Sequence, residues 1–120
     1  MNEASTDSRQ SDALTKLHDE FTLTLPLAQA SSACVRAVAA TGWNLKEEGP
    51  HRIVTKIGVA ITRNPSKIEV LLSESGDQTV VRLNGSILGV GPLQKGHLTA
   101  EINRLRSEIE AAAGGQRARE

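Results

Sequence analysis

The spacing of apolar residues changes in a definite order along the chain. Apolar and polar residues alternate over 19–25, apolar residues then recur at helical spacing over 26–41, and alternation returns in the segments between 43 and 84. Over 98–112 the apolar residues are again three and four positions apart. Alternation is typical of half-buried strands, and spacings of three and four are typical of amphipathic helices. The pattern predicts the order strand, helix, four strands, helix.

Local signals set the expected boundaries of these elements. Pro26 suits the first turn of a helix, where its missing N–H costs nothing, and Gly42 suits a left-handed C-terminal cap, so we expect a helix over 26–41. The later strands are expected at 43–46, 51–61, 67–73 and 78–84. Their expected inward-facing residues are Ile53, Thr55, Ile57 and Val59, then Ile68, Val70 and Leu72, then Thr79, Val81 and Leu83.

Short turns between the later strands favour antiparallel neighbours. The predicted fold class is therefore α+β, a single curved antiparallel sheet of about five strands with two helices on one face, in the order β-α-β-β-β-β-α. The glycine-rich stretch 85–92 is expected to carry the chain out of the sheet, and Gly114 is expected to end the last helix. Stretch 85–96 lacks the glycine spacing of a dinucleotide site and the Gly-Lys-Ser/Thr order of a phosphate loop.

Composition separates the two ends from the middle of the chain. The 14 basic and 14 acidic residues cancel overall, but residues 1–20 carry two basic and five acidic side chains. We expect a flexible acidic arm over 1–16, one domain over 17–113 and a flexible tail over 114–120. A neutral chain with no tyrosine, one phenylalanine and one tryptophan offers little to nucleic acid, which we disfavour as a partner.

The order and lengths of the elements in residues 19–113 resemble the helix-grip and TATA-binding-protein-like folds. That resemblance implies helices packed on one face of a curved antiparallel sheet. In lipid-binding members of the helix-grip class, the sheet and the long helix enclose an apolar cavity. A small apolar ligand between the sheet and the last helix is therefore one expectation, with Trp43, His51 and His97 as candidate pocket residues.

No motif in the sequence points to catalysis, a metal or a cofactor. Cys34 is the only cysteine and lies on an apolar helical stripe, which predicts a buried, inert thiol, no internal disulfide and a cytoplasmic location. His18, His51 and His97 are too far apart in sequence for a recognisable zinc motif, and no Gly-x-Ser-x-Gly elbow is present. No apolar run approaches the length of a membrane span, so no membrane partner is expected. We expect a protein that is not an enzyme.

The outward face of the sheet is the predicted functional surface. Alternation places Lys46, Arg52, Lys56, Lys67 and Arg82 there with Glu69, together with three aliphatic residues. The candidate partner surface comprises Arg52, Val54, Lys56, Leu71, Val80 and Arg82. The leading hypothesis is a small interaction module that uses this face for homo-oligomerisation, as a homodimer for example, or for binding another protein. An ordinary solvated face is the alternative, and the carrier of an apolar ligand is the second functional hypothesis.

Overall fold

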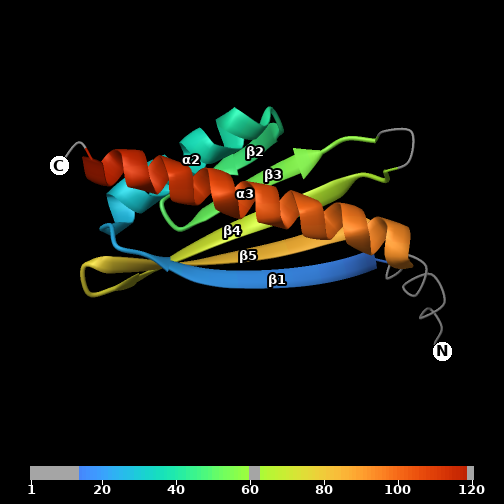
Figure 1. Cartoon of the computed structure of the whole chain (residues 1–120), viewed down its shortest axis with the longest axis horizontal. Coiled ribbons are helices and arrows are strands. Elements are labelled where there is room, and N and C mark those ends of the chain that lie inside the picture. The colour runs from blue at the N-terminus through green and yellow to red at the C-terminus, as the bar shows by residue number, and fades with distance from the viewer. Residues whose placement is uncertain (1–13, 60–62, 119–120) are drawn as a thin grey trace.

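Two helices lie on one face of an antiparallel sheet (Figure 1), as the sequence predicts. The computed structural model describes residues 14–59 and 63–118, and the side chains of residues 14–59 and 63–114. The elements are β1 (Leu14–Leu23), α2 (Leu27–Thr41), β2 (Asn44–Glu48), β3 (Arg52–Ile57), β4 (Ser66–Ser75), β5 (Gln78–Leu88) and α3 (Pro92–Ala118).

The sheet has five strands in the order β1-β5-β4-β3-β2, and every neighbouring pair is antiparallel. The last four strands form a meander, and β1 returns to pair with β5 at the far edge. α3 packs along β1 and β5, while α2 packs beside α3 over the other strands (Figure 1). The fold is thus a two-layer α+β structure with one face of the sheet left uncovered by helices.

β1 begins at Leu14, earlier than the expected start at residue 19. Its first three residues pair with Leu88, Ile87 and Ser86 of β5. The sequence concealed this part of the strand because Thr15 and Asp19 occupy inward-facing positions, which breaks the apolar alternation. The expected boundary of the acidic arm at residue 16 therefore falls within β1, and residues 1–13 lie outside the described residues.

β5 continues to Leu88, so the expectation that stretch 85–92 leaves the sheet is wrong for its first four residues. Ile87 is fully buried in the core, and Gly85 is buried where α3 crosses the strand. A glycine inside a strand is common where another element approaches closely, and the turn reading overlooked that use. The exit from the sheet comes at Gly89 and Gly91, both with positive φ.

β3 is shorter than expected and ends at Ile57. Ile53, Thr55 and Ile57 face the core as predicted, but Val59 is 74% exposed. The prediction for Val59 is wrong because the strand stops before Gly58, so alternation no longer applies. The expected strand residues 60 and 61 lie outside the described residues.

The core lies between the sheet and the two helices. The predicted inward residues of β4 and β5 are all buried, and the α3 stripe of Leu98, Ile102, Leu105 and Ile109 is buried against them. α2 ends at Thr41 and is capped, as predicted, by Gly42, which has a φ of 79° and a hydrogen bond from its N–H to the Ala39 carbonyl. α3 runs past Gly114 to Ala118, because a glycine weakens a helix without having to end it.

Candidate functional site

A groove of about 300 Å³ separates β1 from α3. Leu17 and Ile102 are its apolar members, and both belong to the core or pack against it. Polar side chains form the rim, namely Asp19, Thr99, Asn103 and Arg106. An apolar floor with a few polar groups around it is the usual composition of a small-ligand site, and this volume is at the small end for such sites.

The two walls of the groove follow from strand and helix geometry. Leu17 and Asp19 are two residues apart on β1, so both point to the helical side of the sheet. The residues from α3 lie at positions 99, 102, 103 and 106, which share one side of a helix. That side of α3 faces the edge of the sheet formed by β1.

An ion pair connects the two walls. Arg106 Nη1 donates to both carboxylate oxygens of Asp19 at 3.1 Å, and its Nε lies 3.2 Å from a carboxylate oxygen of Glu110. The guanidinium carbon also lies 4.6 Å from the centre of the Phe21 ring. Arg106 is thus fixed in place at the rim, with its donors aimed at the groove-lining carboxylate.

α3 approaches the sheet closely at Gly85, which pairs with Leu17 across β1 and β5. A Cβ atom on Gly85 would lie 2.9 Å from Ile102 Cδ1 and 3.0 Å from Leu98 Cδ1. These side chains occupy the volume that a larger residue on β5 would take. The floor of the groove is therefore formed by the flexible end of the Ile102 side chain, which packs against the backbone of Gly85.

A buried carboxyl group lies near the first turns of α3. Glu101 is 6% exposed, and its Oε1 accepts a hydrogen bond of 2.7 Å from Ser66 Oγ. Its Oε2 lies 3.6 Å from Arg63 Nε. Burial raises the pKa of the Glu101 carboxyl above its usual range, while the Ser66 hydroxyl, Arg63 and His97 oppose that rise. The group is a candidate proton-binding site in the interior.

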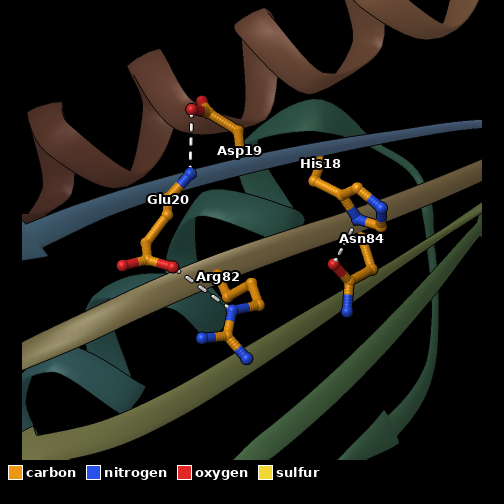
Figure 2. Close-up of a pocket in the computed structure, with 5 residues that line it drawn as sticks. All are labelled: His18, Asp19, Glu20, Arg82 and Asn84. Carbon is orange, nitrogen blue, oxygen red and sulfur yellow. Dashed lines mark hydrogen bonds and ion pairs between the residues drawn. The ribbon is translucent and has the colours of Figure 1, made fainter.

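The uncovered face of the sheet has a wider depression of about 620 Å³ at the β1 edge (Figure 2). His18 Nδ1 and Asn84 Oδ1 are 2.9 Å apart, and Arg82 Nε donates to Glu20 Oε1 at 3.3 Å. Both contacts are direct cross-strand pairs of β1 and β5. Figure 2 shows these four side chains on one side of β1 and Asp19 on the α3 side. The lining is polar, so this depression suits water or a polar molecule.

All six residues of the predicted partner surface lie on strand positions that face away from the helices. Val54, however, is only 5% exposed. It pairs with Glu47 on one side and Glu69 on the other, and both carboxylates bind the Arg52 guanidinium. This ion-pair bridge covers Val54, and the hydrogen bond from Arg52 holds the pKa of the Glu69 carboxyl below its usual range.

The rest of that surface is also less apolar than expected. Leu71 and Val80 are half-buried, and Arg82 is paired with Glu20. Lys56 is exposed. The apolar cluster inferred from the sequence is therefore not an open patch.

The three predicted pocket residues have separate surroundings. Trp43 lies under Arg104, whose guanidinium carbon is 5.7 Å from the ring centre. The His51 ring Nδ1 is 3.2 Å from the Leu72 carbonyl oxygen. His97 lies on α3 near Glu101. Trp43 and His51 therefore contact different parts of the chain.

The sequence did not indicate that the groove residues form a site. Leu17 precedes the expected strand, and Thr99, Asn103 and Arg106 resemble an ordinary solvated helix face. Their positions beside the Leu98–Ile102–Leu105 stripe could have indicated the groove, because residues at the border of an apolar stripe lie where the helix meets the neighbouring element.

Three further features concern the cysteine, potential metal ligands and the length of the helices. Cys34 is fully buried, and burial raises the pKa of its thiol to about 12, as expected for an inert core cysteine. Among the residues that the structure describes, no three potential metal ligands lie together. No helix in the described ranges is long and apolar enough to cross a membrane.

The solved structures that this chain resembles have helix-grip folds, although no protein-family model and no curated protein sequence matches it. Ara h 8.0201 superposes with a TM-score of 0.62 at 11% identity, over 84% of this chain and 96% of that one. An AHSA1-like protein from Rhizobium etli gives 0.56 at 20% identity, over 84% and 83%. The TATA-binding-protein-like alternative gains no support from these similarities.

A third similar structure is the di-domain ARO/CYC StfQ from the steffimycin biosynthetic pathway. Its TM-score is 0.65 at 8% identity, over 96% of this chain and 56% of StfQ. Identities this low show that the fold is shared and say nothing about activity. Because the fold also occurs in an ARO/CYC protein, the expectation that this chain is not an enzyme stays a prediction.

Proposed function

We propose that this protein binds and carries a small, largely apolar ligand in the groove between β1 and α3. The observation that carries the proposal is the combination of an apolar floor, Leu17 and Ile102, with a polar rim. The helix-grip fold adds support, because the sheet and long helix of that class are the elements between which such ligands lie.

The rim suggests the chemistry of the ligand. Arg106 borders the groove while its Nη1 and Nε bind Asp19 and Glu110, and Thr99 and Asn103 add neutral hydrogen-bonding groups. A ligand with one anionic or hydroxyl end would place that end here and its apolar part over Ile102. Displacement of the Ile102 side chain from above Gly85 would deepen the site toward the core.

Two measurements test the proposal. Native mass spectrometry of freshly purified protein is expected to show a fraction with added mass that organic extraction removes. Titration with decanoate, an anionic aliphatic probe, followed by calorimetry is expected to show saturable binding. A clean apo mass together with no decanoate binding would contradict the proposal.

A pair of variants locates the site. Asn103→Trp places a large side chain over the groove and is expected to abolish decanoate binding. Ser107→Trp, an exposed position one turn later on α3, is the matched control and should bind like the wild type. Equal losses in both variants would place the ligand elsewhere.

Self-association or protein binding through the uncovered sheet face stays a prediction of the sequence. The half-buried Leu71 and Val80 are its remaining apolar members. Light scattering distinguishes it from the carrier: a wild type that is already monomeric, with no change in Leu71→Asp, removes the oligomer version.

A further inference from the structure

Exposed aliphatic side chains gather at one end of the molecule. They are Val59 at 74%, Val90 at 71%, Leu93 at 58% and Leu88 at 47% exposure, and we call these four the apolar tips. Leu88 ends β5, Val90 lies on the β5–α3 connection and Leu93 is in the first turn of α3. Val59 follows β3, so all four are at the end where α3 begins (Figure 1). Folding leaves these four side chains exposed to solvent, and exposed apolar side chains that cluster are a common feature of interaction sites.

The backbone fixes this end in place. Asn64 Nδ2 donates to the Leu88 carbonyl at 2.8 Å, and the Leu88 N–H donates to the Pro65 carbonyl at 3.2 Å. The β3–β4 and β5–α3 connections are therefore joined. Val90 stands between Gly89 and Gly91, whose φ angles of 96° and 105° are ones that glycine adopts freely. Its outward position follows from the turn.

A row of lysines crosses the sheet beside the apolar tips. Lys56 pairs with Lys67, Lys67 with Ser86, and Ser86 with Lys16, in one register across four strands. We call the three lysines the lysine row; at about 4.8 Å between strands it spans about 14 Å. All three are exposed, and none of the ion pairs within the described part of the chain involves them.

The charge of the lysine row is only partly balanced within the folded chain, where Glu69 attracts Lys67. Like charges directly opposite on neighbouring strands repel, as Lys56 and Lys67 do here. Lys95 in the first turn of α3 adds a further positive charge at this end, while Glu101 is buried and paired with Arg63. An anionic partner would remove this repulsion.

We propose that this end of the molecule docks peripherally on an anionic phospholipid membrane. The lysine row and Lys95 would contact the headgroups, and the apolar tips would enter the interfacial region. The sequence predicts no membrane partner because it has no span-length apolar run, and single exposed aliphatic residues give no comparable signal. This docking surface is distinct from the ligand groove, so either proposal can fail alone.

Other occupants fit less well. A nucleic acid would use the lysines but not the aliphatic tips, and the chain has no exposed aromatic platform because Phe21 is buried and Trp43 lies under Arg104. A second copy meeting this end would bring two lysine rows together. An anionic lipid surface matches both the charge and the apolarity of this end.

Vesicle flotation with the full chain tests the proposal. The wild type is expected to float with vesicles of phosphatidylcholine and phosphatidylserine at low salt, less at high salt, and not with phosphatidylcholine alone. Lys56→Gln/Lys67→Gln is expected to weaken binding about 25-fold, at about fivefold per lysine. Val90→Ser/Leu93→Ser should weaken it about tenfold or more by removing the inserted aliphatic groups.

Two control variants test whether the losses are specific to the lysine row and the apolar tips. Arg82→Gln removes one charge elsewhere on the same sheet face, and Leu45→Ser removes an exposed aliphatic group on β2; both should bind within about twofold of the wild type. Circular dichroism confirms folding of each variant. Absence of wild-type flotation at low salt overturns the proposal, as do equal losses in the controls.

Two further results would replace it. Binding to an RNA or DNA oligonucleotide that the lysine variant loses and the serine variant retains would assign the surface to nucleic acid. Light scattering that shows a wild-type oligomer dissociated by the serine variant, without flotation, would assign it to a second copy.

Discussion

Cys34 lies on the inner side of α2, where desolvation suppresses its chemistry. A rise of the thiol pKa from 9.0 to about 12 lowers the thiolate fraction at neutral pH about a thousandfold. We expect native protein to react negligibly with Ellman's reagent over a time in which denatured protein reacts completely. Rapid stoichiometric reaction of the native protein would show that the α2 side of the core opens readily.

Burial raises the pKa of the Glu101 carboxyl as well, but this group has polar partners that oppose the rise. Its pKa in the folded protein is above the unfolded value, so the stability it contributes is fully present below the unfolded pKa of about 4.3 and is lost as pH rises through the folded pKa. Glu101→Gln keeps an acceptor for the Ser66 hydroxyl and carries no charge.

We therefore expect Glu101→Gln to be more stable than the wild type at pH 7 and about equally stable at pH 4. Urea unfolding at both values measures the difference. The pair with Arg63 opposes this result, and a variant that is less stable at pH 7 would mean that the pair outweighs the burial of the charge.

At the scale of elements, the approach of α3 to β5 depends on the absence of a side chain at Gly85. Gly85→Val would meet Ile102 and Leu98 and is expected to reduce the free energy of unfolding by about 2 kcal/mol through overpacking. Ile102→Ala alone should cost about 3 kcal/mol through the cavity it leaves.

In the double variant the new valine would occupy part of that cavity. Its loss should be smaller than the sum of the single losses by about 1 kcal/mol or more, as measured by a double-mutant cycle. Additive losses would mean that the two side chains do not compete for the same volume.

Local sequence signals predict elements well and the contacts between them poorly. Pro26 and Gly42 delimit α2 because helix ends depend on the residues at the ends. The extension of β5 through Gly85 depends on α3, which follows in sequence, and could not be inferred from the strand itself. The groove depends on Asp19 meeting Arg106, 87 positions apart, and no local pattern encodes that pair.

At the scale of the whole molecule, charge is unevenly distributed although the total is zero. The lysine row lies at the end where α3 begins, whereas Glu74 and Asp77 lie at or beside the β4–β5 turn at the opposite end (Figure 1). Such a distribution orients a protein in the field of a charged surface before any contact forms. The effect weakens with salt, since the screening length falls from about 30 Å at 0.01 M to about 8 Å at 0.15 M.

Residues 1–13 also contribute to the charge at this end of the chain. They carry Glu3, Asp7 and Asp12 against Arg9, a net of −2, and they connect to β1 at Leu14, beside the lysine row. Removing them changes the net charge of the chain from 0 to +2. If the proposed membrane docking is correct, deletion of 1–13 should strengthen flotation with phosphatidylserine vesicles several-fold at low salt, and the gain should shrink at physiological salt.

Charge can be separated from length by a second variant. Glu3→Gln/Asp7→Asn/Asp12→Asn keeps every residue of the segment and removes its three carboxylates, so it should reproduce most of the gain. If the deletion strengthens binding but the neutralised segment does not, the segment acts by occupying space near the lysine row instead of by its charge. If neither variant changes a measurable wild-type affinity, these carboxylates lie beyond the range at which they oppose the lysines.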